Sequence, residues 1–302
     1  MADIHYAPLT DSLGALHVHG PDADKFLQSQ FSNDLLSLPR GGGQWSSYST
    51  AKGRMIANFF LWRGENGLFL FLARDLVEEV AQRLRKFRMM AKAEIEITTE
   101  EVWGLWGSDL DPAAIGVGET AGVAVLASLP WPVSAALLLV SDTATAGDAL
   151  AKLPATATTS NDWWVAAIRA GTGFITRASS EQIIPQELNL EVLGGINFKK
   201  GCYPGQEIVA RSHYLGVLKR QCYLVHASAP LEPGQEIFAP SMGEQAVGVV
   251  INVASEGSEH LALVVLRAVN ASEPLHLGGG NGSKLRIGTL PYTLPLDAQA
   301  KE

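Results

Sequence analysis

Cysteine is scarce in this chain of 302 residues, which contains only Cys202 and Cys222. Two cysteines with no C-x-x-C pair and no cysteine–histidine spacing suggest neither a disulfide framework nor a zinc site. They are also too few to hold a stable iron–sulfur cluster. We therefore expect reduced thiols and no bound metal.

Long apolar runs are also missing. The longest, residues 68–73 and 135–140, fall far short of the roughly 20 residues that a membrane helix needs. The amino terminus has no basic start followed by an apolar stretch, so no secretory signal is expected. These features predict a cytoplasmic protein without a membrane span, which we expect to be a monomer.

Positive charge is in deficit, because 23 Lys and Arg stand against 31 Asp and Glu, a net charge of −8. A surface of this sign repels a phosphate backbone, which disfavours direct nucleic-acid binding. Residues 199–220 are the exception, with a single acid, Glu207, among five cations. The cations are Lys199, Lys200, Arg211, Lys219 and Arg220. This stretch predicts attraction for a small anion.

The chain has enough apolar material, 47%, for two or three packed units. Apolar spacing in the first hundred residues predicts one α+β unit. Its expected elements are a strand at 13–18, a helix at 22–35, a hairpin of 56–62 and 68–72, a helix at 76–91 and a strand at 93–97.

Signals are weaker over residues 107–160, where strands at 123–127 and 135–140 and a helix at 144–153 predict a second α+β layer. Ser160 is expected to cap a helix that opens with Trp163 and Trp164 and stops at Gly171. After Arg220, β-rich runs at 222–226, 246–253 and 261–269 predict a small barrel or sandwich. We expect one region over 1–220 and a second domain over 221–302.

One segment has unusual chemistry, Lys200-Gly201-Cys202-Tyr203-Pro204-Gly205-Gln206-Glu207. It gathers a thiol, a cation, a carboxylate and an amide within eight residues. A free thiol has a pKa near 8.5, and the neighbouring Lys200 with local N–H groups would raise its thiolate fraction. This predicts a reactive Cys202. The alternative is that Cys202 is a small buried hydrophobe, as is expected for Cys222 in its apolar run.

This segment resembles the signature of the YgfZ family, folate-binding proteins implicated in making or repairing iron–sulfur enzymes. The resemblance extends to residues 184–190 and 209–211, to 26–34 and 51–55 near the amino terminus, and to 290–292 in the tail. It therefore covers nearly the whole chain and includes the wider superfamily of glycine-cleavage aminomethyltransferases.

The resemblance implies two related α+β lobes and a carboxy-terminal β-barrel arranged around a central channel that holds tetrahydrofolate. It implies chemistry at Cys202 and a ligand contact for Gln206. The carboxylates of a folate tail would suit a cation such as Arg211, and Trp163 or Trp164 would form a wall for the pterin, with ordinary core packing as the alternative. Iron–sulfur client proteins are the implied partners.

Two departures from the aminomethyltransferases stand out. Their catalytic aspartate region reads Gly53-Arg54-Met55-Ile56-Ala57-Asn58 here, and neither Ala57 nor Asn58 can accept a proton at neutral pH. Where they have a pterin-binding glutamate in Leu-Glu-Ala-Gly, this chain has Arg169, which is expected to bind the folate tail or stack on a ring. We therefore expect no simple aminomethyltransferase activity.

The leading hypothesis is a folate-binding accessory protein for iron–sulfur enzymes that affects tRNA modification indirectly. The alternative is a folate-dependent aminomethyl or one-carbon transferase or demethylase in which another residue replaces the aspartate. A third possibility is a scaffold that binds client proteins without chemistry.

Overall fold

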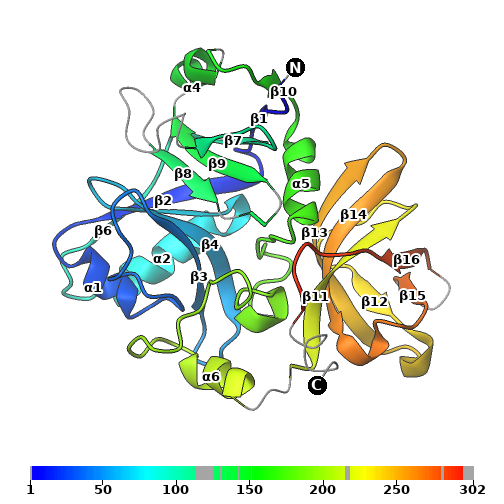
Figure 1. The fold of residues 1–302 in the computed structure, drawn as a ribbon. Helices are drawn as coiled ribbons and strands as arrows, with labels where there is room; N and C mark the ends of the chain where they lie inside the picture. Colours follow the sequence, from blue (N-terminus) through cyan, green and yellow to red (C-terminus); the bar gives the residue numbers. More distant parts are fainter. Residues whose placement is uncertain are drawn as a thin grey trace.

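The computed structural model consists of three lobes, two built on five-stranded sheets and one a closed six-stranded barrel (Figure 1). It describes residues 2–112, 125–129, 131–132, 134–141, 143–150, 152–214, 218–279 and 282–294. Within these ranges no helix is both long enough and apolar enough to cross a membrane. The predicted α+β fold with a carboxy-terminal barrel is confirmed.

The first lobe contains a sheet with the strand order β3-β4-β5-β2-β6. Its strands are β2 (Leu13–His19), β3 (Gly43–Ser49), β4 (Met55–Arg63), β5 (Leu68–Ala73) and β6 (Glu94–Ile97), with helices α1 (Ala23–Gln28) and α2 (Val77–Phe87) and the short η1 (Arg74–Leu76). β4 and β5 form the expected hairpin. Both are buried almost throughout, which explains why they read as continuous apolar runs.

The helix expected over 22–35 is wrong beyond residue 28, where α1 ends. The next residues pair with β3 instead. Phe31 forms an isolated bridge to Tyr48, and the Asn33 amide donates to the Trp45 carbonyl over 2.9 Å. Phe31 and Leu35 are buried although they lie outside the helix, and their spacing therefore matched that of the apolar face of a helix. β3 was not predicted, because its buried positions include serines and the sequence therefore lacks the apolar pattern of a strand.

The second lobe has the strand order β10-β1-β7-β9-β8. Its strands are β1 (His5–Pro8), β7 (Glu101–Gly107), β8 (Val125–Leu129), β9 (Ala135–Ser141) and β10 (Thr156–Ala157), with helices α4 (Thr143–Leu150) and α5 (Ser160–Arg169). The start of the strand expected at 123–127 lies outside the described residues. Thr159 caps α5 in a capping box with Asp162, one residue before the expected cap.

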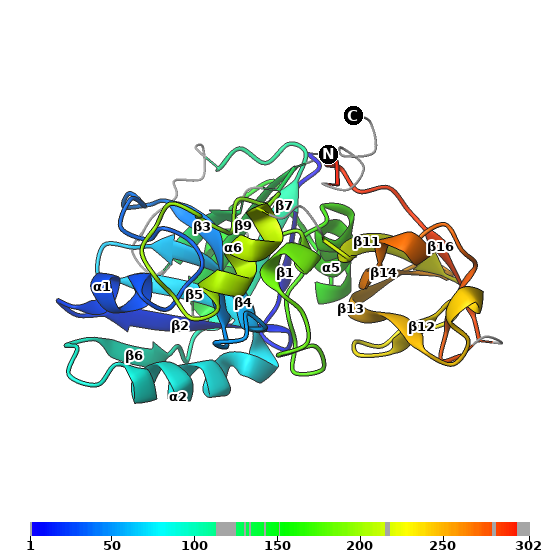
Figure 2. The same cartoon turned by 90° about the horizontal axis from the view of Figure 1, so that it is seen from below.

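The third lobe is a barrel with the strand order β11-β14-β13-β12-β15-β16, seen at the right of Figures 1 and 2. Its elements are β11 (Arg220–Ala227), β12 (Glu236–Phe238), η3 (Pro240–Met242), β13 (Ala246–Glu256), β14 (Glu259–Arg267), η4 (Ala268–Asn270), β15 (Leu275–Leu277) and β16 (Lys284–Ile287). Val250 and Val264 face the barrel interior, whereas Ile251 and Leu263 belong to the large core shared with α5 and the first lobe. Both faces of β13 and β14 are therefore apolar.

The chain between α5 and η2 (Pro185–Leu188) begins with residues 171–176, which we call the junction segment. It runs between β4 and β13 with its backbone buried. Asn58 of β4 donates to the Gly173 carbonyl and accepts from the Ile175 N–H, each over 2.7 Å. On the other side, Asn252 of β13 pairs with both backbone groups of Phe174. Two amide side chains thus satisfy backbone groups that water cannot reach.

The carboxy-terminal tail closes this junction. The Tyr292 hydroxyl donates to the Gly171 carbonyl over 2.7 Å and accepts from the Asn189 amide over 3.2 Å. The same amide also reaches the Cys222 carbonyl of β11 at 3.1 Å. Gly171 has φ +70°, and a Cβ there would lie 2.6 Å from the Tyr292 ring. Glycine is therefore required at this position for two separate reasons.

We predict that Tyr292→Phe lowers the free energy of unfolding by about 1–2 kcal/mol, because the Gly171 carbonyl loses its tyrosine donor and the Asn189 amide an acceptor. Urea denaturation followed by circular dichroism measures the change. Tyr214→Phe is the control, since Tyr214 is 72% exposed and its substitution should leave stability unaltered. Equal midpoints for Tyr292→Phe and the unmodified protein would contradict the prediction.

Candidate functional site

The segment 200–207 leads into helix α6 (Gln206–Tyr214), whose first two residues it includes, and lies against the first lobe (Figure 2). We call residues 200–205 the thiol loop. The fold brings it into contact with two other segments that carried the family resemblance, 26–34 and 51–55. Three stretches separated by up to about 170 positions in the sequence therefore form one local structure.

Lys200 fixes the first end of the thiol loop. Its Nζ donates to the backbone carbonyls of Gln28, Phe31 and Asn33 at 2.6, 2.6 and 2.9 Å. Burial lowers the pKa of the Lys200 ammonium to about 8, with Asp34 opposing the shift, so the group is still mostly charged at neutral pH. It satisfies carbonyls left open where α1 ends. The sequence predicted that Lys200 would activate Cys202, and the structure gives its ammonium these three backbone partners.

Gly205 fixes the other end, because its backbone touches the turn between β3 and β4. It has φ +82°, and a Cβ there would lie 2.6 Å from both the Gly53 Cα and the Thr50 carbonyl oxygen. Gly53 itself has φ +73°, and its own added Cβ would meet the Ile208 side chain at 2.8 Å. The two glycines therefore allow a backbone-to-backbone contact that no other residue pair would permit.

Between these anchors the thiol loop presents Cys202 to solvent. The next residue, Tyr203, is buried and lies under the Lys200 ammonium, whose Nζ is 5.2 Å from the ring centroid. Burial raises the pKa of Tyr203 to about 12. The alternative of a buried Cys202 is thus excluded, whereas Cys222 is buried as expected and its pKa is raised by burial to about 12.

The other predicted loop residues lie at the start of α6. Gln206 is half-buried and its N–H donates to the Tyr203 carbonyl over 3.2 Å. Glu207 and Arg211 are exposed one helical turn apart, and Gly201 is exposed with open space around it. The fold therefore gathers Cys202, Gln206 and Arg211 on one side of the first lobe.

Trp163 lies elsewhere, fully buried in the core. Its ring packs against Trp106 and Trp131 with centroids 5.4 and 4.8 Å apart, and a Cβ at Gly104 would come within 2.4 Å of it. This placement of Trp163 agrees with the alternative of ordinary core packing. The neighbouring Trp164 is half-exposed and packs edge-on against Phe174 of the junction segment.

Arg169 forms an ion pair with Glu256 at the end of β13. From the same helix, Asn161 exchanges hydrogen bonds with the backbone of Ser255. Both contacts connect α5 to the hairpin of β13 and β14. Arg169, which stands where the transferases have a glutamate, thus pairs with an acid of the barrel.

A cleft of about 250 Å³ opens where the first lobe, α5, the junction segment and the barrel meet. Its polar lining includes Asp11, Arg74 and Asp75 from the first lobe and Asn252 from the barrel, and Trp164 supplies an aromatic wall. The four predicted folate contacts, Trp163, Arg169, Gln206 and Arg211, are not among its lining residues. Sequence reasoning missed this site because its members come from loops and strand ends that carry no shared motif.

A search of protein-family models finds no match to this chain. The tRNA-modifying protein YgfZ of Photorhabdus laumondii is 32% identical, over 95% of this chain and 93% of the relative. The tRNA-modifying proteins YgfZ of Escherichia coli O7:K1 and Serratia proteamaculans are 31% and 30% identical, over 95% and 92% of this chain and 94% and 89% of their own lengths. This chain belongs to the YgfZ family.

The fold of this YgfZ family member is similar to that of the glycine cleavage system aminomethyltransferase T from Bartonella henselae. The TM-score is 0.74, over 97% of this chain and 87% of that one. The two sequences are only 14% identical, so the likeness shows a common fold. The resemblance to the YgfZ family is confirmed, and the expected likeness to the aminomethyltransferases is confirmed for the fold.

Asn58 explains one departure of this YgfZ chain from the transferase pattern. Its amide must donate to one backbone group of the junction segment and accept from another, which an ionised carboxylate cannot do. The residue is fully buried. Position 58 is therefore structural here.

We predict that Asn58→Asp lowers the free energy of unfolding by about 2–4 kcal/mol, because a buried carboxylate would face the Gly173 carbonyl without a donor between them. Thermal and urea denaturation at neutral pH measure the loss. Asn66→Asp, in the exposed loop between β4 and β5, is the matched control and should cost less than about 0.5 kcal/mol. A fully stable Asn58→Asp protein would show that the position tolerates an acid.

Proposed function

We propose that this YgfZ family member is a folate-binding accessory protein that supports the assembly or repair of iron–sulfur enzymes. Effects on tRNA modification, for which its relatives are named, would then be indirect. Cys202 is the reactive group and tetrahydrofolate the ligand. In this proposal residues 1–220 form the folate-binding region and residues 221–302 the barrel that closes it.

The observation that carries the proposal is an exposed thiol on a loop that is fixed at both ends. Lys200 and Gly205 hold the ends of the thiol loop, and Cys202 lies between them. A thiol in such a place reaches a partner molecule without local unfolding, and only an accessible thiolate is a useful nucleophile or redox group. A purely structural cysteine is more often buried.

The cleft at the meeting point of the lobes has the chemistry that a folate needs. The Trp164 ring offers a stacking surface for the pterin, and the Asp11 and Asp75 carboxylates are acceptors for its amino and ring N–H groups. Arg74 is a cation for the carboxylates of the glutamate tail. Bound tetrahydrofolate would supply a reduced pterin that can accept a one-carbon unit.

Simple one-carbon transfer is less well supported than the accessory role, because Asn58 is committed to the junction segment and Ala57 carries no polar group. A replacement base in the cleft would have to be Asp11 or Asp75, the two carboxylates in its lining. For Asp75 the free choice of partners is reduced. One of its carboxylate oxygens already accepts the Arg177 backbone N–H at 2.9 Å. The thiol therefore carries the proposal.

We predict that Cys202→Ser fails to complement a strain lacking this gene, with a drop of at least tenfold in the tRNA thiolation that depends on a radical iron–sulfur enzyme. The hydroxyl keeps the size of the side chain but removes its nucleophilic and redox chemistry. Cys222→Ala, in the core, is the control for general loss of protein and should complement. Full complementation by Cys202→Ser would instead favour a scaffold without thiol chemistry.

We predict that Trp164→Leu weakens tetrahydrofolate binding about five- to tenfold through loss of stacking. Anaerobic titration calorimetry measures the affinity. The adjacent core residue provides the control, because Trp163→Phe should lower the melting temperature without changing the affinity.

Arg169→Gln tests the folate contact predicted from the sequence. It should leave the affinity unchanged if pairing with Glu256 is the role of this side chain. No measurable binding of tetrahydrofolate to the unmodified protein would refute the folate part of the proposal.

A further inference from the structure

Two histidines occupy alternate positions of β2, a strand that lies beside the edge strand β6. Residues two apart on a strand point to the same side, so the His17 and His19 rings are neighbours, with centroids 4.8 Å apart. In the antiparallel register His17 is opposite Glu96 and His19 is opposite Glu94. Glu96 therefore lies directly across from one imidazole and diagonally across from the other.

The three side chains converge on one point. Glu96 Oε2 is 3.9 Å from His17 Nδ1, and Glu96 Oε1 is 3.5 Å from His19 Nε2. One potential ligand atom from each residue lies within 4.8 Å of the others. Ligand atoms around a tetrahedral zinc ion lie roughly 3.4 Å apart, as follows from metal–ligand bonds of about 2.0–2.1 Å. Small side-chain rotations would have to close the difference, and of the three residues Glu96 is exposed.

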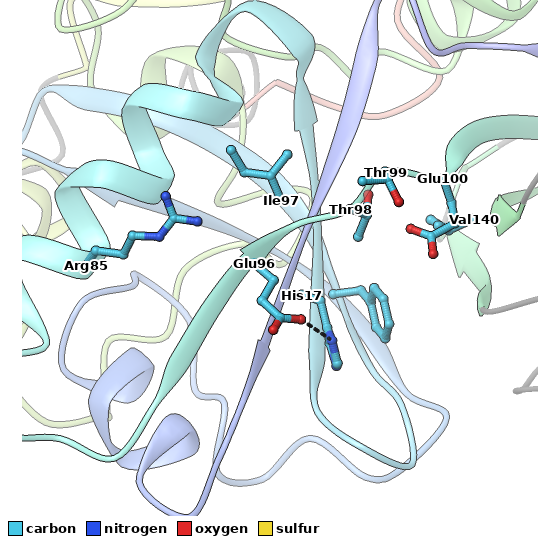
Figure 3. Close-up of a pocket in the computed structure, with 9 residues that line it drawn as sticks. His17, Arg85, Glu96, Ile97, Thr98, Thr99, Glu100 and Val140 are labelled. Carbon is cyan, nitrogen blue, oxygen red and sulfur yellow. Dashed lines mark ion pairs between the residues drawn. The ribbon is translucent and has the colours of Figure 1, made fainter.

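The site is held on one side and open on the other. The His17 ring is stacked on Phe69 of β5, with centroids 4.4 Å apart and an interplanar angle of 13°, which fixes its orientation. His17 and Glu96 line a cleft of about 640 Å³ together with Thr98 and Glu100. Figure 3 draws these side chains and marks the His17–Glu96 pair with a dashed line. A metal ion bound here would keep a coordination position open toward solvent.

The nearby basic groups of α2 have other partners. Arg85 donates twice to the Ile95 carbonyl, at 3.0 and 2.8 Å. Arg88 pairs with Glu94 at 2.8 Å. Of the two carboxylates that β6 presents on this side, Glu94 thus has a cation as its partner, whereas Glu96 faces the imidazoles.

We propose that His17, His19 and Glu96 bind a divalent transition metal, with Zn²⁺ as the best match to two imidazole nitrogens and one carboxylate. The ion would also fasten the edge strand β6 to β2. The proposal is independent of the folate and thiol roles, since none of the three residues belongs to either site. It departs from the expectation of no metal, which was drawn from the cysteine pattern alone.

The test uses untagged, full-length Cys202→Ser protein, because the exposed thiol would compete for zinc. After treatment with a chelator, the protein is titrated with ZnCl₂ by calorimetry, and with CoCl₂ while visible absorption is recorded. We expect one ion per chain at micromolar affinity and the absorption bands of tetrahedral cobalt. In the same background, His19→Gln and Glu96→Gln should each weaken zinc binding at least tenfold.

His5→Gln is the matched control. His5 Nε2 and Asp3 Oδ1 are 2.9 Å apart, an imidazole–carboxylate pair like those at Glu96 but outside this cluster. This substitution should leave zinc affinity unchanged. Zinc should also raise the melting temperature of the parent protein but not that of His19→Gln, because binding to the folded state alone stabilises it. Absence of zinc binding, or binding that survives both His19→Gln and Glu96→Gln, would overturn the proposal.

Discussion

The structure depends on one constraint, that the backbone of the junction segment crosses the protein interior where water cannot satisfy it. Asn58 from the first lobe and Asn252 from the barrel satisfy the hydrogen bonds of this backbone from opposite sides. Each pairs with one N–H and one carbonyl, so each replaces a missing neighbouring strand. The lobes are consequently held in one arrangement, and the large hydrophobic core continues from the first sheet across α5 to the barrel. Tyr292 completes this arrangement from the tail.

That constraint also bears on chemistry. A side chain that must donate and accept in a buried site cannot serve as a base, which removes position 58 from any proton transfer. The thiol loop shows the opposite arrangement, because Lys200 is half-buried and Gly205 is buried, whereas Cys202 between them is exposed. Lys200 would ordinarily be considered an activating cation, but its ammonium donates to three backbone carbonyls, that of Gln28 at the end of α1 and those of Phe31 and Asn33 just after it. The accessibility of Cys202 is therefore the stronger part of the case.

Sequence patterns predicted elements whose apolar period is decided locally, such as the hairpin of β4 and β5, helix α2 and the barrel strands β13 and β14. They failed where tertiary contacts compete with local preference. α1 ends before the predicted residue because the residues after it form hydrogen bonds with β3. β3 lacks the apolar pattern of a strand because several of its buried residues are serines. Arg169 was assigned to the ligand from the resemblance to the transferase pattern, and Trp163 from the stacking chemistry of an aromatic ring. Their actual partners, Glu256 and the Trp106–Trp131 pair, lie far away in the sequence. The His17–Glu96 cluster was hidden for the same reason, since it exists only once β2 pairs with β6.

The position of the two cysteines limits what the proposed thiol chemistry can be. A disulfide requires Cβ atoms about 3.5–4.5 Å apart and two thiols that can meet. Cys222 is fully buried in β11 with its carbonyl bonded to Asn189, whereas Cys202 is exposed on the thiol loop. The chain has no third cysteine. If a peroxide oxidises Cys202 to a sulfenic acid, with water or an alcohol as the leaving product, the thiol that resolves it must come from a second molecule. The same holds if Cys202 accepts a sulfane sulfur from a persulfide donor, which leaves as a thiol. An accessory role toward another protein follows more naturally from this arrangement than a self-contained redox cycle.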